Sequence, residues 1–156
     1  MEKPGRLRVA TALTGLLLTA GIVMVILFWP EPVDTGWSSY IERVLREGYE
    51  RGLPTWFGYN ELEFTANIAM FMPLGFFASL LFPARWALLA VPVLAAFSYL
   101  AETVQGSVLA DRFSDPRDIV ANTTGALLGA LVGVVLTSLV HLRDRQREEA
   151  SRRVKR

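Results

Sequence analysis

The 156-residue sequence contains no cysteine and a single histidine, His141. Disulfide frameworks and thiolate chemistry are therefore excluded, and so are histidine-rich metal sites. Long stretches also lack charge, because the charged residues (20% of the chain) gather between apolar runs and at both ends. With a mean hydropathy of +0.34, this distribution is typical of a membrane protein and argues against a soluble domain.

Four apolar runs are long enough to cross about 30 Å of hydrocarbon as helices. They cover approximately residues 9–29, 64–82, 86–104 and 119–142. We interpret the first as a retained helix, because its apolar core is too long for a signal peptide and no clear cleavage site follows. The sequence thus predicts a single all-α domain over residues 1–156, a polytopic bundle of four transmembrane helices.

Basic residues gather at three places that an even number of spans puts on one side of the membrane. These are the amino terminus, the short connection at Arg85 and the arginine-rich tail over residues 143–156. The positive-inside rule assigns that side to the cytoplasm. Both termini are then cytoplasmic, and the two longer loops face outward.

The first outward loop contains an amphipathic segment over about residues 35–51. Trp37, Ile41 and Leu45 fall near helical spacing, and charged residues fill the other face. Aromatic residues follow it, of the types that favour the headgroup level. We expect a helix lying in the outer membrane interface. The alternative is a loop packed on the bundle.

Small residues in the last run predict close helix packing. Gly125, Gly129 and Gly133 lie four apart, a spacing that lets two helix backbones approach each other. Their partner is either another span or a second copy of the chain, so this face is a candidate for oligomer formation. In the second run, Pro73 removes a backbone hydrogen bond and frees a carbonyl.

Polar and ionisable side chains gather at the outward ends of the last three spans. Such groups are costly inside a membrane and usually face the interior, a partner or a water-filled cavity. The candidate ligand-binding residues are Asn67, Glu102, Gln105, Arg112, Asp115, Asp118 and Asn122.

Each of these residues also has a purely structural interpretation. Asp115 is placed to cap the last helix, with Pro116 as its first residue and Asp118 as the capping-box acid. The two asparagines can form interhelical hydrogen bonds. Glu102 needs a partner because it lies within an apolar helix, and Arg112 is the nearest candidate.

Three segments, FTANIAMFMPLGFF, AETVQ and DRFSDPRDIVANTTGALLG, together resemble the VanZ-like family of small bacterial membrane proteins. The matching positions are Asn67, Phe71, Pro73 and Gly75, then Glu102 and Gln105, then Arg112, Asp118, Asn122, Gly125 and Gly129. The resemblance covers about residues 64–133 and implies a multi-pass protein of the bacterial plasma membrane. The founding member is associated with low-level resistance to the glycopeptide teicoplanin.

Three functions remain open. The first is an outward-facing pocket that binds an envelope lipid or glycolipid headgroup, with Arg112 recognising phosphate. Its partners are then membrane lipids, or a lipid-linked cell-wall or glycopeptide ligand. The second is a non-catalytic module that the polar cluster holds together, and the third is a small lipid or ion transporter. Binding is favoured over catalysis, because no nucleophile or metal motif is recognisable, and we expect neither a cofactor nor nucleic-acid binding.

Overall fold

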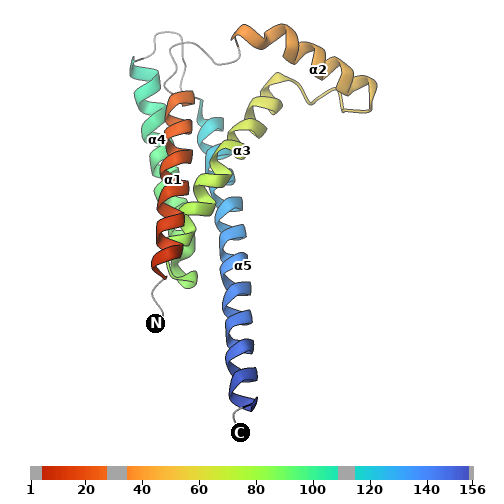
Figure 1. Cartoon of the computed structure of the whole chain (residues 1–156). Coiled ribbons are helices and arrows are strands. Elements are labelled where there is room, and N and C mark those ends of the chain that lie inside the picture. The colour runs from red at the N-terminus through yellow and green to blue at the C-terminus, as the bar shows by residue number, and fades with distance from the viewer. Residues whose placement is uncertain (1–4, 28–34, 109–114, 155–156) are drawn as a thin grey trace.

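The computed structural model describes residues 5–27, 35–108 and 115–154, and these residues are almost entirely helical (Figure 1). The elements are α1 (Arg6–Leu27), the 3-10 helix η1 (Thr35–Trp37), α2 (Ser38–Glu50), α3 (Tyr59–Leu80), the 3-10 helix η2 (Ala84–Leu89), α4 (Ala90–Val108) and α5 (Pro116–Val154). Four stretches, α1, α3, η2 with α4, and α5, are long and apolar enough to cross a membrane. The predicted all-α bundle with four transmembrane helices is confirmed.

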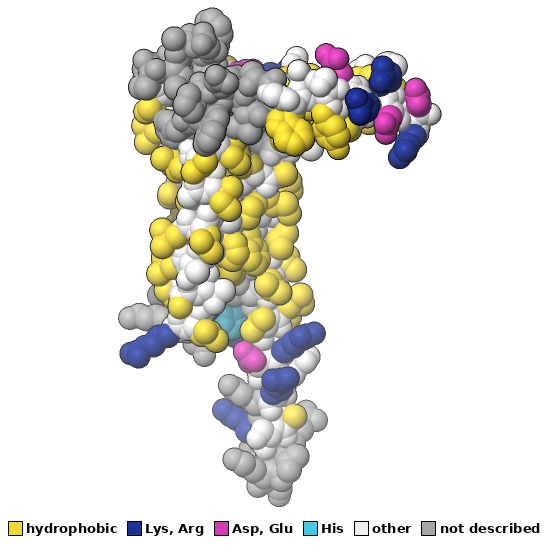
Figure 2. All heavy atoms as spheres, turned by 45° about the horizontal axis from the view of Figure 1, so that its top comes forward, with side chains coloured by type: hydrophobic (Ala, Val, Ile, Leu, Met, Phe, Trp, Pro, Cys, Tyr) yellow, Lys and Arg dark blue, Asp and Glu magenta, His cyan; other side chains and the backbone are white. Residues whose placement is uncertain are grey.

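The two ends of the bundle differ in the chain segments that they contain (Figure 1). At one end α3 and α5 begin and α4 finishes, and we call it the polar end. The start of α1, the η2 turn and the arginine-rich continuation of α5 lie toward the other, which we call the basic end. Figure 2 shows a broad band of hydrophobic side chains on the bundle between them. The shared position of the three basic segments agrees with an even number of spans, and their cytoplasmic location stays a prediction.

α3 packs along α5 through small residues of both helices. A Cβ atom built on Gly75 of α3 would overlap the backbone of Ala126. Two glycines of α5 meet the α3 backbone in the same way, Gly125 at Ile68 and Gly129 at Met72, and a Cβ atom on Gly133 would overlap the hydroxyl of Ser79. The two backbones are therefore in direct contact, as this spacing favours. The partner of the glycine face is thus α3 of the same chain, and a second copy would have to contact a different surface.

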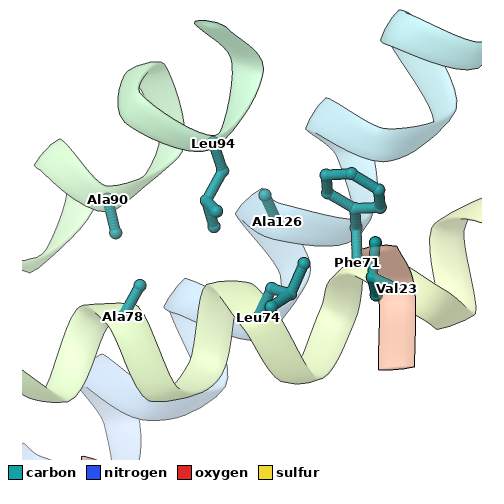
Figure 3. Packing of buried hydrophobic residues seen from close by; sticks show 7 residues of the cluster. All are labelled: Val23, Phe71, Leu74, Ala78, Ala90, Leu94 and Ala126. Atoms are coloured by element: carbon teal, nitrogen blue, oxygen red, sulfur yellow. The ribbon is translucent and has the colours of Figure 1, made fainter. Parts of the chain in front are cut away.

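A small hydrophobic core joins all four spans. Its members are Val23 of α1, Phe71, Leu74 and Ala78 of α3, Ala90 and Leu94 of α4, and Ala126 of α5 (Figure 3). Phe71 and Leu74 are almost fully buried, whereas the outward faces of the helices expose many leucines and valines. Lipid tails are as apolar as those side chains, so the bundle needs close packing more than it needs a large buried area.

The third span does not begin as a regular α-helix. The sequence predicts a helix from about Trp86, but the chain forms the 3-10 helix η2 before α4 starts at Ala90. Pro92 explains the difference, because it has no N–H to donate to the carbonyl of Leu88 and its ring would crowd that carbonyl.

The last helix continues through the basic tail. α5 runs for 39 residues, which at 1.5 Å per residue is about 58 Å, nearly twice the hydrocarbon thickness. The tail over residues 143–154 is helical because it consists mainly of good helix formers, above all arginine, and contains neither glycine nor proline. Figure 1 shows it projecting alone beyond the basic end.

Arg8 has a structural role that the sequence did not reveal. Its Nη2 atom donates to the carbonyl oxygen of Phe82, 2.9 Å away, just beyond the end of α3. Carbonyls at a helix carboxyl end lack intrahelical partners, and a positive charge there is favourable. The basic residue that we used only to predict topology therefore also ties α1 to α3.

α2 lies across the bundle axis and projects away from it (Figure 1). No residue of α2 is buried, and Trp37 and Tyr40, which meet edge to face at its start, are both exposed. Figure 2 shows hydrophobic side chains on its side toward the bundle's apolar band and charged ones around its far end. A helix with no buried residue differs from the alternative of a loop packed on the bundle. Its location in the membrane interface stays a prediction.

The topology is testable by cysteine labelling, since the chain has no cysteine of its own. We expect Ser38→Cys at the polar end to react with a membrane-impermeant maleimide in intact cells. Ser151→Cys in the tail helix should react only after permeabilisation, because the positive-inside rule places it in the cytoplasm. Labelling of Ser151→Cys in intact cells would contradict the predicted orientation.

The α3–α5 contact predicts a sharp difference between two glycines. Gly129→Ala should lower the free energy of unfolding by about 1–3 kcal/mol, because the added methyl group overlaps the backbone of Met72. Gly21→Ala in α1 is the matched control: nothing lies within 4 Å of a Cβ atom there. Thermal unfolding of both variants in detergent measures the difference, and equal stability would show that the helices do not approach this closely.

Candidate functional site at the polar end

The start of α5 is capped as the sequence predicts. Pro116 is the first helical residue, and the Oδ1 atom of Asp115 accepts a hydrogen bond from the backbone N–H of Arg117 at 2.8 Å. The backbone N–H of Asp118 donates to the carbonyl oxygen of Asp115 at 2.9 Å. Asp115 is thus an N-cap residue, and its carboxylate faces the positive end of the helix dipole.

The capping-box acid comes from a different helix than expected. The Oε1 atom of Glu102, in α4, accepts from the backbone N–H of Asp115 at 2.7 Å. A capping box uses an acid three residues into the same helix, here Asp118, but α4 ends beside the start of α5 and Glu102 takes that position. Its side chain is only 6% exposed, so a buried carboxylate ties two spans together.

Asp118 instead connects α5 to α3. Its Oδ1 atom accepts from Nδ2 of Asn67 at 2.8 Å. Both side chains are half-buried, and a charge-assisted hydrogen bond of this kind is stronger than a neutral one. The carboxylate therefore joins α3 to the start of α5 at the polar end.

A second polar contact lies deeper between α4 and α5. Nδ2 of Asn122 donates to the hydroxyl oxygen of Ser98 at 2.9 Å, and both residues are fully or nearly fully buried. The Oδ1 atom of Asn122 is buried without a hydrogen-bond partner among the described residues. Sequence reasoning missed Ser98, although its position one turn before Glu102 in an apolar helix is a usable signal.

A polar cavity of about 80 Å³ opens beside these contacts. Its lining residues are Asn60, Glu63 and Phe64 of α3, and Asp115, Arg117 and Asp118 around the start of α5. The guanidinium of Arg117 lies over the ring of Phe64, 5.9 Å from its centroid, and 3.7 Å from a carboxylate oxygen of Glu61. Sequence reasoning missed Asn60 and Glu63 because they precede the apolar run and resemble ordinary loop residues.

Two predicted site residues are not placed by the structure. Arg112 lies outside the described residues, and the side chain of Gln105 is likewise outside them, although its backbone belongs to α4. The remaining five predicted ligand-binding residues, Asn67, Glu102, Asp115, Asp118 and Asn122, all lie at the polar end and form interhelical or capping hydrogen bonds. Within the described ranges, no three acidic, histidine or cysteine side chains are placed to hold a metal ion.

The contact between Glu102 and Asp115 predicts how substitutions at Glu102 behave. Glu102→Gln should keep most of the stability, because its amide oxygen can still accept from the Asp115 N–H. Glu102→Leu should lower the free energy of unfolding by about 0.5–1.5 kcal/mol, because it removes this hydrogen bond between the two helices. Thermal unfolding in detergent compares the two. If glutamine is as harmful as leucine, the charge of Glu102 matters and its acceptor oxygen does not.

Comparison with known proteins places this arrangement in a family. A family model described as VanZ/LLP1 matches residues 16–137, from α1 through most of the membrane part of α5. The match thus includes the later part of α1 and all of α2, which the sequence resemblance did not cover. The chain matches no curated protein and no solved structure. The four membrane-competent helices and the extent of this match show that the chain is a membrane protein and belongs to the VanZ/LLP1 family.

Proposed function

We propose that the polar end binds the headgroup of an envelope lipid in the outer leaflet of a bacterial plasma membrane. The observation that carries this proposal is the polar cavity walled by α3 and the start of α5. In a membrane helix bundle, a wall of ionisable side chains is itself an indication of a functional site. A link to teicoplanin resistance would follow if that lipid were a cell-wall precursor.

The wall of the cavity favours a headgroup that donates hydrogen bonds. It carries three carboxylates, those of Glu63, Asp115 and Asp118, against one guanidinium. That guanidinium, of Arg117, already pairs with Glu61. Carboxylates accept hydrogen bonds from hydroxyl and ammonium groups and repel phosphate. The ligand class is therefore a sugar-bearing or amine-bearing lipid, and the phosphate contact that we expected of Arg112 is not needed for it.

The size of the cavity limits what enters it. A volume of about 80 Å³ holds several waters, or one ammonium or hydroxymethyl group, since a single water needs about 10–15 Å³ on the same measure. Ligand pockets for whole small molecules are about 300–1,000 Å³. The cavity thus receives one group of the headgroup while the remainder lies at its rim. The exposed side chains of Trp37, Tyr40 and Trp56 supply the aromatic types found at headgroup depth.

A second candidate function is a non-catalytic structural module. The direct contacts Asn67–Asp118, Asn122–Ser98 and Glu102–Asp115 favour it, because groups that satisfy one another need no ligand. The two candidates differ at the cavity wall, since Glu63 lies on the cavity but in none of these three contacts. A change at Glu63 therefore leaves these three contacts in place, and thermal unfolding of the same variant measures its own effect on stability.

The test is lipid selectivity of the purified protein. The protein is mixed with phosphatidylethanolamine, a diglucosyl diacylglycerol and phosphatidic acid of identical chains in phosphatidylcholine, and retained lipids are identified by native mass spectrometry. We expect the amine or sugar lipid to be enriched over phosphatidic acid. Glu63→Gln should reduce that enrichment about three- to tenfold, because the glutamine oxygen still accepts a hydrogen bond and only the difference between a charge-assisted and a neutral one is lost.

Glu47→Gln is the matched control, because Glu47 is an exposed acid of α2 that does not line the cavity. It should leave the enrichment unchanged. If the wild-type protein is folded and retains no lipid in preference to phosphatidic acid, headgroup binding is wrong and the structural module is supported.

A further inference from the structure

A second cavity lies next to the polar end, between α1 and α3, and its wall is almost entirely apolar. It has a volume of about 410 Å³ and is lined by Thr19, Ile22, Val23 and Ile26 of α1, and by Ala66, Asn67, Met70 and Pro73 of α3. The hydroxyl of Thr19 donates to the carbonyl of Gly15 within its own helix at 2.8 Å. Asn67 therefore contributes the polar group that this groove presents.

The groove exists because α1 and α3 diverge toward the polar end. Nearer the basic end they touch closely, since a Cβ atom on Gly15 would overlap the ring of Phe77. Toward the polar end, α3 leans away from α1 (Figure 1). The side chain of Ile22 is 61% exposed, so the groove opens sideways and is not an enclosed cavity.

Asn67 connects this groove to the polar cavity. Its side chain lines the groove, and its Nδ2 atom donates to Asp118, which lines the polar cavity. The apolar and polar cavities are thus separated by one hydrogen-bonded pair of side chains. A molecule with an acyl chain and a hydrogen-bonding head would have surfaces that match both.

We propose that the groove between α1 and α3 holds one acyl chain of the lipid whose headgroup binds at the polar cavity, entering sideways from the bilayer. The inference rests on the proposed headgroup binding and specifies which end of the lipid contacts which helices. The groove lies on membrane-spanning helices, so the medium around its mouth is hydrocarbon. An acyl chain is the occupant that matches both this medium and the apolar wall.

The groove orients the lipid more than it adds affinity. An acyl chain gains no hydrophobic free energy on leaving the bilayer, because lipid tails are as apolar as the groove wall. What it gains is dispersion contact with a fixed surface, which depends on the shape of the chain. The groove therefore aligns the chain so that the head lies at Asn67 and Asp118.

Photocrosslinking tests the inference. The probe is phosphatidylethanolamine with a diazirine in the middle of one chain, added to the protein in phosphatidylcholine nanodiscs. We expect adducts at Ile22, Ile26 and Met70, mapped by mass spectrometry. Ile22→Trp should reduce the adducts on Ile26 and Met70 at least about fivefold, because the indole fills the groove.

Leu17→Trp is the volume-matched control. Leu17 is 71% exposed, does not line the groove and lies on the opposite face of α1 by helical spacing, so groove labelling should persist. Both positions are exposed, and thermal unfolding verifies that both variants remain folded. Adducts spread evenly around α1 and α3 would overturn the inference, and so would groove labelling that does not change in Ile22→Trp. A disulfide between two copies of the chain in an Ile22→Cys variant would also overturn it, because a second protein helix would then occupy the groove.

The same probe with a phosphatidic acid head separates this inference from the proposed function. Equal groove labelling by both heads supports the acyl-chain groove while it overturns headgroup selection. Headgroup enrichment in native mass spectrometry without groove labelling leaves the proposed function standing and overturns the groove.

Discussion

The polar end depends on one buried carboxylate that serves a neighbouring helix. The backbone donors in the first turn of a helix have no acceptors within that helix, so side chains from elsewhere often supply them. Glu102 of α4 provides one for Asp115 of α5. This contact sets the height of α5 against α4, and it leaves Asp118 in place to meet Asn67 of α3. The hydrogen bonds Glu102–Asp115 and Asn67–Asp118 thereby align α3, α4 and α5.

Close backbone contact between α3 and α5 complements that alignment. Without a hydrophobic force between helices in lipid, association relies on packing, and packing is best where glycines remove side chains from the interface. Gly75 and Gly129 allow this approach. α1 joins at Gly15 and Phe77 but then separates from α3, and the groove results from that divergence. The same bundle thus combines one tight helix pair with one open pair.

In the proposed site, the polar cavity and the apolar groove would contact different parts of one lipid. Carboxylates around the start of α5 would select a donor-bearing headgroup, and the apolar groove would align its chain. Asn67 and Asp118 hold the helices together, so in the proposed site the same two residues would serve binding and folding. Lipid selectivity and thermal unfolding therefore have to be measured on the same variants.

The sequence by itself determined the four spans, the amphipathic helix after the first of them, the cap at Asp115 and the family, because each depends on local hydrophobic runs, helical spacing or an ordered set of short segments. It also identified Glu102, Asp118 and Asn122 as polar residues in need of partners. Only the tertiary structure decided those partners: Asp115 N–H for Glu102, Asn67 for Asp118 and Ser98 for Asn122. It likewise decided that the glycine face meets α3 and that a groove opens between α1 and α3. Spacing along one helix specifies a face but not which neighbouring helix covers it, because that choice depends on how all the spans pack at once.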